Sequence, residues 1–119
     1  MRNSNTKVRC EKRKLTKCNG IVKTYSEVQY AFADVLENDS TIKEFISNFP
    51  LTDFPLTDGK YTTDFYCTTI SGEIVVYECV FRRHLTKPLT AKLLDASRNY
   101  WLRRGVEWRL VIDAEKCFV

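Results

Sequence analysis

Two β-rich runs separated by a short turn constrain the fold more than any other feature of the chain. They span residues 61–69 and 73–81, and Ile70-Ser71-Gly72 joins them. A three-residue loop with glycine in the left-handed conformation is a common hairpin connection. With this loop, the numbers of residues that face each other across the strands sum to 142, which sets Asp64 opposite Glu78. A two-residue loop would turn the two carboxylates to opposite faces of the sheet, so this pairing depends on the turn.

Apolar residues at helical spacing predict two helices before this hairpin. Ser26 is a typical N-cap, and the helix after it keeps apolar residues at helical spacing until it ends near Asn38. A second, short helix is expected over residues 41–49, because its apolar residues also lie on one stripe and Pro50 closes it. Two prolines and an Asp-Gly pair then predict a loop over residues 50–60.

The C-terminal part of the chain predicts one longer helix and one more strand. The break at Pro88 precedes Thr90, a candidate helix cap. This helix is expected to run to Arg104, with Gly105 as the left-handed residue that ends it. Residues 106–112 then form a strand in which Leu110, Val111 and Ile112 are expected to be buried. Helices, a hairpin, a helix and a strand in this order predict an α/β domain with a mixed β-sheet flanked by helices.

The length of the chain suits one hydrophobic core. With 119 residues, we expect a single domain over residues 24–119 and a basic N-terminal arm over residues 1–23. The arm has no sustained periodicity, although a short strand near Ile21 and Val22 is compatible with it. No apolar run approaches the roughly 20 residues of a membrane-spanning helix. The polar, basic N-terminus lacks the apolar stretch of a secretory signal, so a cytoplasmic protein is expected.

The five cysteines indicate neither a disulfide framework nor a zinc site. Their number is odd, no two of them form a CxxC pair, and His84 is the only histidine that could join them. We therefore expect reduced thiols that pack as small apolar groups, and we expect His84 to be a loop residue. The cysteines are Cys10, Cys18, Cys67, Cys79 and Cys117.

Charge is distributed unevenly along the chain, although the net charge is only +4. Residues 1–23 carry eight basic side chains and one acidic, residues 24–64 two basic and eight acidic, and residues 65–119 nine basic and six acidic. Basic clusters of this kind either hold a phosphate backbone or form ordinary solvated faces, and the sequence leaves both open. The candidate nucleic-acid contacts are Arg13, Lys14, Arg82, Arg83, Lys92 and Arg98.

Asp64 and Glu78 on adjacent strands would form half of a divalent-metal site. Carboxylate oxygens are the ligands that Mg²⁺ and Mn²⁺ prefer, and such an ion activates water against a phosphodiester. A lysine two residues after the second acid would lie on the same face of the strand and stabilise charge there. Without a further pattern, the two residues are better explained as an aspartate near a turn and a strand carboxylate paired with an arginine.

Short motifs along the chain carry a resemblance to a known family. YTTDF at residues 61–65 resembles a YTPDF element, and VYECV at residues 76–80 falls where that family has an (E/Q)VK strand. The residues from 99 to 111 are similar to a helix-to-strand passage of the form YWxxRGxxWxxV. SEVQ at residues 26–29 is similar to a SxxE helix start, and Pro50 matches a proline after the second helix. The family is that of the TnsA-like transposon endonucleases, in the PD-(D/E)xK nuclease superfamily. The resemblance implies a restriction-endonuclease-like core.

The resemblance also implies catalytic positions that this chain retains only in part. Family catalysis uses a helix glutamate, the aspartate of the PD element and a strand lysine, which fall on Gln29, Asp64 and Val80. Glu78 stands where the family has Glu or Gln, so Asp64 and Glu78 are the implied ligands of Mg²⁺ or Mn²⁺. Gln29 offers a neutral carbonyl oxygen, and Val80 can neither donate a proton nor stabilise an anion. Glu27 cannot replace Gln29, since two residues along a helix are a rotation of about 200°.

Arg82 is the candidate for the missing basic group. It lies two residues beyond Val80, on the same face if the strand continues. Because an arginine stays protonated, it would stabilise charge but serve poorly as a base. The aromatic residues Tyr100, Trp101 and Trp108 are compatible with base stacking, but their spacing favours core packing.

The resemblance favours a mobile-element protein whose nuclease fold has lost efficient cleavage and acts by binding DNA or a protein partner. Family members cut DNA at transposon ends beside a second transposase subunit, which makes such a subunit one candidate partner. Two alternatives stay open. One is an active Mg²⁺-dependent endonuclease in which Gln29 completes the metal shell of Asp64 and Glu78. The other is a small phage or mobile-element protein that acts as an inhibitor or interaction module without nucleic-acid binding.

Overall fold

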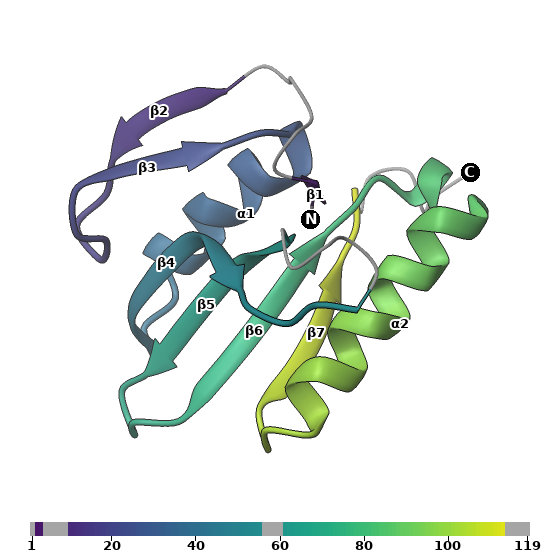
Figure 1. Cartoon of the computed structure of the whole chain (residues 1–119). Helices are drawn as coiled ribbons and strands as arrows, with labels where there is room; N and C mark the ends of the chain where they lie inside the picture. The colour runs from purple at the N-terminus through teal and green to yellow at the C-terminus, as the bar shows by residue number, and fades with distance from the viewer. Residues whose placement is uncertain (1, 4–9, 56–60, 114–119) are drawn as a thin grey trace.

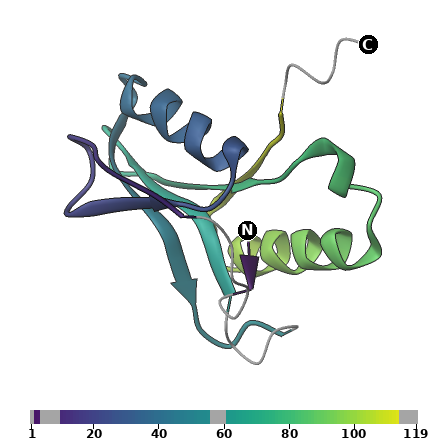
Figure 2. The same cartoon turned by 90° about the horizontal axis from the view of Figure 1, so that it is seen from above.

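A mixed β-sheet with one α-helix on each face forms the centre of the structure (Figures 1 and 2). The computed structural model describes residues 2–3, 10–55 and 61–113. β4 is antiparallel to β5, β5 is antiparallel to β6, and β7 runs parallel to β6. The predicted α/β fold with a mixed sheet flanked by helices is therefore confirmed. The strands of this sheet are β4 (Ile42–Leu51), β5 (Tyr61–Thr69), β6 (Ile74–Cys79), β7 (Glu107–Val111) and the two-residue β1 (Arg2–Asn3), which also pairs with β5.

The hairpin of β5 and β6 has the predicted register. Phe65 faces Tyr77 and Cys67 faces Val75, so the numbers of the partners sum to 142. Gly72 has a φ of 88° in the turn, a conformation that glycine adopts without the steric cost of a Cβ. The short loop therefore decides which side chains of the two strands meet.

The helix predicted after Ser26 is present as α1 (Glu27–Glu37). Ser26 is its N-cap, and the Ser26 hydroxyl accepts a hydrogen bond from the amide of Gln29 over 3.1 Å. This bond satisfies one of the amides that a helix leaves without an intrahelical partner at its start. The helix ends at Asn38, as the sequence predicts.

α2 (Pro88–Leu102) begins three residues earlier than predicted, because Lys87 and not Thr90 is its N-cap. Thr90 lies inside its first turn instead of capping it, because Pro88 occupies the first helical position, where its missing N–H is not needed. The helix ends at Leu102 with Arg103 as its C-cap, two residues before the predicted end, and Gly105, with a φ of 71°, leads the chain into β7. α2 thus lies in the connection between the parallel strands β6 and β7. The predicted burial of Leu110 is wrong, because β7 is the edge strand of the sheet and Leu110 is 40% exposed.

The predicted short helix over residues 41–49 is wrong, because this segment forms β4. Its apolar spacing suits one stripe of a helix, but it suits equally a strand that changes face along its length. Phe45 packs in the core under α1, and Phe49 packs against the core under α2. The change of face occurs at Asn48, which has a φ of 53°. Pairing with β5 along most of the strand prevails over the helical periodicity.

Figure 2 shows α1 and α2 on opposite faces of the sheet, and an apolar core lies under each helix. The buried members of the core under α1 are five aliphatic residues, two phenylalanines, Tyr77 and two cysteines of the sheet. The core under α2 is richer in aromatic residues. Its buried members are Leu51, Phe54, Tyr61, Val76, Leu93 and Trp101.

Residues 10–24 belong to the folded structure instead of forming an irregular arm. β2 (Glu11–Lys14) and β3 (Ile21–Thr24) form a separate two-stranded antiparallel sheet, which includes the expected strand near Ile21. The guanidinium of Arg13 fixes this hairpin to α1, since it donates to Asp34 Oδ1 over 2.8 Å and to Tyr30 O over 2.7 Å. Residues 1 and 4–9 of the predicted arm lie outside the described residues.

The cysteines that the structure describes are free thiols, as the sequence predicts. Burial raises the pKa of Cys67 and of Cys79 to about 12, so neither thiol is reactive at neutral pH. Cys117 lies outside the described residues. No helix in the described part of the chain is long and apolar enough to cross a membrane.

Candidate functional site

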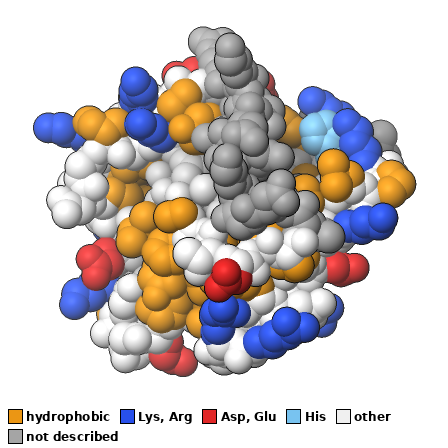
Figure 3. Space-filling view, viewed as in Figure 1, with side chains coloured by type: hydrophobic (Ala, Val, Ile, Leu, Met, Phe, Trp, Pro, Cys, Tyr) orange, Lys and Arg blue, Asp and Glu red, His pale blue; other side chains and the backbone are white. Residues whose placement is uncertain are grey.

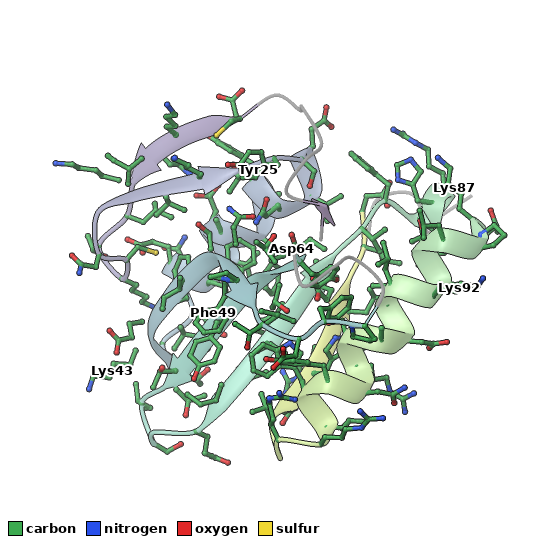
Figure 4. The ribbon with its side chains drawn as sticks, viewed as in Figure 1. Tyr25, Lys43, Phe49, Asp64, Lys87 and Lys92 are labelled. Carbon is green, nitrogen blue, oxygen red and sulfur yellow. The ribbon has the colours of Figure 1, made fainter. Side chains whose placement is uncertain are left out.

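Three of the residues singled out in the sequence, Gln29, Asp64 and Glu78, meet at the centre of the fold. The backbone amide of Asp64 donates to Glu78 Oε1 over 3.2 Å, and Gln29 Nε2 donates to the backbone carbonyl of Asp64 over 3.2 Å. All three are almost completely buried. Figure 4 shows Asp64 on β5 near the middle of the molecule, with Tyr25 above it and Phe49 of β4 below it.

The strands lose their regular pairing at this point. In β5, Tyr61 and Thr63 face α2, whereas Phe65 and Cys67 face α1, so the strand changes face at Asp64. Asp64 Oδ2 accepts a hydrogen bond from the amide of Cys79 over 2.6 Å and takes the place of a missing ladder partner. The aspartate therefore holds β5 and β6 together where the ladder is interrupted.

The carboxylate of Glu78 accepts hydrogen bonds from four described donors. Tyr61 Oη donates to Oε2 over 2.9 Å and Thr63 Oγ1 donates to Oε2 over 3.1 Å. Ser97 Oγ, on α2, donates to the same oxygen. The fourth donor is the amide of Asp64, on Oε1. These donors come from β5 and α2, so Glu78 ties the sheet to the helix.

Two tryptophans orient the hydroxyls that contact Glu78. Trp101 Nε1 donates to Thr63 Oγ1 over 2.9 Å, and Trp108 Nε1 donates to Ser97 Oγ over 3.0 Å. Because a hydroxyl has one proton and an indole N–H can only donate, each hydroxyl must direct its own proton to Glu78. The two tryptophans serve the core, as the sequence predicts.

The environment of Glu78 shifts the pKa of its carboxyl group upward. Burial is the largest cause, and the hydrogen bonds from Ser97, Tyr61 and Thr63 oppose it. With no exposed surface, the side chain has lost the water that stabilises its charge. Its oxygens are occupied by the protein itself, which is the state of a structural carboxylate and not of one ready to accept an ion.

Gln29 is held with its amide in one orientation. Its Oε1 accepts from the amide of Tyr25 over 2.8 Å, and its Nε2 donates to Asn48 Oδ1 over 3.0 Å as well as to the carbonyl of Asp64. Asn48 Nδ2 in turn donates to Lys23 O over 2.7 Å. The end of Gln29 that points to Asp64 is therefore a donor, which repels a cation instead of binding it.

The two positions considered for a basic group do not supply one beside the acids. Val80 is buried, and its amide donates to Val111 O over 2.9 Å. β6 ends at Cys79, so the condition under which Arg82 would share the face of Glu78 is not met. Arg82 instead begins the short 3-10 helix η1 (Arg82–His84), is exposed, and donates from its backbone amide to Asp113 Oδ1 over 2.6 Å. His84, expected in a loop, ends this helix.

The donor set does not fit Mg²⁺ or Mn²⁺. Within residues 10–55 and 61–113, no three His, Cys, Asp or Glu side chains are grouped as a metal-binding site requires. The two acids that do come together are buried and engaged by protein donors, and the third position presents an amide N–H. Hard divalent cations need several free oxygen ligands, and the side chains here offer too few.

Five of the six candidate nucleic-acid contacts are exposed, and Arg13 is not. The side chain of Arg13 is 19% exposed and is bound to Asp34 and Tyr30. The exposed candidates are Lys14, Arg82, Arg83, Lys92 and Arg98.

Strand alternation adds Lys12 and Lys23 to these contacts. They share the outer face of the β2–β3 hairpin with Lys14. Recognition of β2 as a strand would have found them.

No protein-family model matches the sequence, and no curated protein matches it. The resemblance to TnsA-like endonucleases rests on the motifs quoted above and on the residues that those motifs bring together.

Proposed function

We propose that the chain is a TnsA-like nuclease scaffold of a mobile element that binds DNA without cutting it. The observation that supports this proposal is the meeting of Gln29, Asp64 and Glu78 at one point of the fold. These residues lie on α1, β5 and β6, and the resemblance assigns all three to one catalytic site. A restriction-endonuclease-like core accounts for their convergence, and the replaced residues account for the loss of cleavage.

Impaired cleavage follows from the contacts of the same residues. Metal-assisted hydrolysis needs an ion that polarises the phosphate or activates water. Glu78 already receives four protein donors, Gln29 points an N–H toward Asp64, and Val80 carries no charge. A divalent ion would have to break several buried hydrogen bonds, each of which costs about 1–3 kcal/mol when a buried partner is left unsatisfied.

DNA is the favoured ligand because the N-terminal hairpin and α2 expose basic side chains. Arg13 and Lys17 are bound to α1 and the turn after it. Lys14 of the hairpin and Lys92 and Arg98 of α2 are exposed. With a net charge of +4, such a surface attracts a polyanion through phosphate contacts.

A protein partner, such as a transposase subunit, is a second candidate. Figure 3 shows an apolar patch over β4 and β5, beyond the cover of α2. Ile46 is 51% exposed there, next to Phe49 and Tyr66, whose rings stack 4.4 Å apart. Exposed apolar patches of this kind mark surfaces that bind proteins.

The absence of cleavage is tested with supercoiled plasmid, incubated with Mg²⁺ or with Mn²⁺. We expect no nicking above a protein-free control. Asp64→Asn is the matched variant, since it keeps an oxygen that can accept from the amide of Cys79 but removes the charge. Nicking by the wild type that disappears in this variant would show an active endonuclease and contradict the proposal.

Binding is tested by titrating a fluorescent DNA duplex at several salt concentrations. The logarithm of the binding constant should fall linearly with the logarithm of the salt concentration, because phosphate contacts release counterions. If the duplex is not bound even at about 50 mM salt, DNA binding is excluded and the protein-partner candidate becomes the better one.

A further inference from the structure

We propose that the outer face of the β2–β3 hairpin is the DNA-contacting surface, and that Lys12, Lys14 and Lys23 bind the phosphate backbone of a duplex. This inference rests on the DNA binding proposed above and adds the place of contact. The three lysines do not form a cluster in the sequence, because Lys23 belongs to the second strand. The fold brings them together.

The register of the hairpin separates its two faces. Lys12 faces Lys23 and Lys14 faces Ile21, and these four side chains are exposed. The other face carries the pairs Glu11–Thr24 and Arg13–Val22. Val22 and Thr24 are 2% and 1% exposed, so β3 packs onto the protein on this inner face, whereas Glu11 at the start of β2 is exposed.

The exposed side chains on the outer face of the strands are the three lysines and the uncharged Ile21. Figure 3 shows basic side chains at the upper left, where the hairpin lies in Figure 1. Lys12 and Lys23 are direct cross-strand neighbours. Like charges at such positions repel each other and destabilise the pair of strands. A phosphate bound between them offsets this repulsion. A ligand of high negative charge therefore stabilises a pair of lysines that is unfavourable in the free protein.

Contacts on the inner side hold the hairpin in place. Arg13 binds Asp34 and the carbonyl of Tyr30, and Lys17 Nζ donates to Leu36 O over 3.0 Å. Lys23 O accepts from Asn48 Nδ2, which belongs to the network of Gln29. The lysines therefore project from a fixed platform beside Gln29 and Asp64.

The shape of the element favours double-stranded DNA. A two-stranded β-ribbon is one of the two elements that the major groove of DNA admits, the other being an α-helix. Lysine side chains on such a ribbon reach the phosphates on either side of the groove as flexible point charges. The contact is therefore expected to depend on charge and groove shape more than on base sequence.

The test uses a variant that replaces Lys12, Lys14 and Lys23 by Gln in the full chain. A matched control replaces Lys43, Lys87 and Arg103 by Gln. These three basic residues are also exposed and lie outside the hairpin, as Figure 4 shows for Lys43 and Lys87. We expect the hairpin variant to lose tenfold or more in duplex affinity and its salt slope to become shallower by about 2.7, since each phosphate contact contributes about 0.9. The control should change affinity less than about threefold.

A single charge reversal separates a ligand contact from a structural role. Lys12→Glu turns the repulsive pair with Lys23 into an attractive one, so the melting temperature of the free protein should rise by about 2–5 °C. Duplex affinity should fall about tenfold, because a phosphate contact becomes a repulsion. A fall in both quantities would indicate that Lys12 serves the fold, and it would contradict the inference.

The outcomes distinguish this inference from the proposed function. A wild type that binds no duplex at low salt overturns both. A wild type that binds, with the hairpin variant equal to the control variant, overturns only the hairpin as the contact surface. Binding to phosphatidylserine vesicles without binding to the duplex would assign the lysines to a lipid surface and likewise overturn the inference.

Discussion

At the scale of single residues, Glu78 shows that the role of an acid depends on what its oxygens contact. The position matches the resemblance to a nuclease strand, and the side chain type suits a metal. In the fold, however, Tyr61, Thr63, Ser97 and the amide of Asp64 all donate to it. The carboxylate therefore holds β6, β5 and α2 together instead of facing a substrate.

A first prediction concerns the stability of Glu78→Gln as a function of pH. Burial raises the pKa of Glu78 in the folded protein above its ordinary value of 4.5. A raised pKa in the folded state stabilises the protein below the unfolded pKa, and this contribution is lost as pH rises through the folded pKa. The wild type should therefore lose stability relative to Glu78→Gln as pH rises above 4.5. Urea unfolding of both proteins between about pH 4 and about pH 8 measures the difference, and a difference independent of pH would contradict it.

A second prediction concerns Gln29→Glu. The replacement removes the donor that serves Asn48 Oδ1 and Asp64 O and puts a negative charge near both. We expect the variant to lose about 2–4 kcal/mol of unfolding free energy in the presence of a chelator. Mn²⁺ should restore part of this loss, because a third carboxylate then accompanies Asp64 and Glu78.

Thermal unfolding with Mn²⁺ and with EDTA checks the prediction for Gln29→Glu. The wild type is the control, and its melting temperature should not respond to Mn²⁺. A variant that stays equally unstable with and without Mn²⁺ would show that the three positions do not form the remnant of a metal site.

The sequence identified which residues meet but not what their atoms contact. Gln29, Asp64 and Glu78 followed from motifs and strand register, which are local signals. Ser97 and Trp108 gave no such signal. Ser97 donates to Glu78, and Trp108 donates to Ser97, and both hydrogen bonds form only after α2 has packed on the sheet. Contacts of this kind depend on tertiary structure and cannot be derived from spacing.

At the scale of elements, β4 and the N-terminal hairpin were the segments that the sequence did not predict. The apolar residues of β4 fit a helix because the strand changes face at Asn48, which converts a period of two into an apparent helical stripe. The strand β2 has only four residues, all charged, and offers no alternation of apolar and polar side chains. α1, α2, β5, β6 and β7 were predicted because periodicity, caps and turns agreed there.

A third prediction tests the change of face in β4. Asn48 has a φ of 53°, which glycine adopts freely and alanine does not. Asn48→Gly and Asn48→Ala both lose the side-chain bonds to Gln29 and Lys23. Asn48→Ala should be less stable than Asn48→Gly by about 1 kcal/mol, measured by chemical unfolding. Equal stability of the two variants would mean that the backbone at this position is not constrained as described.

At the scale of the whole molecule, one sheet separates two cores that share its strands. Cys67 and Cys79 lie in the core under α1, whereas Trp101 belongs to the core under α2. Because β5 and β6 contribute to both, neither core can open without disrupting the strands of the other. We therefore expect a single cooperative unfolding transition.

A fourth prediction uses these residues as separate reporters. Burial raises the pKa of Cys67 and Cys79 to about 12, so their thiols should resist alkylation until the protein unfolds. The alkylation of these two cysteines is measured by mass spectrometry as the denaturant concentration rises. Its midpoint should equal the midpoint of unfolding measured by tryptophan fluorescence. Alkylation of Cys67 before the fluorescence changes would show that the core under α1 opens alone.

The hydroxyl groups that donate to Glu78 restrict the order in which substitutions can accumulate around it. Under the proposed loss of cleavage, selection for catalysis no longer keeps an acid at this position. Loss of Glu78 would leave the donors of Tyr61, Thr63 and Ser97 without an acceptor, so those side chains would have to change first. A lineage can thus retain the glutamate for the contacts that it makes between β6, β5 and α2. Among related sequences, an invariant glutamate at this position would then be a mark of the scaffold and by itself no sign of a working nuclease.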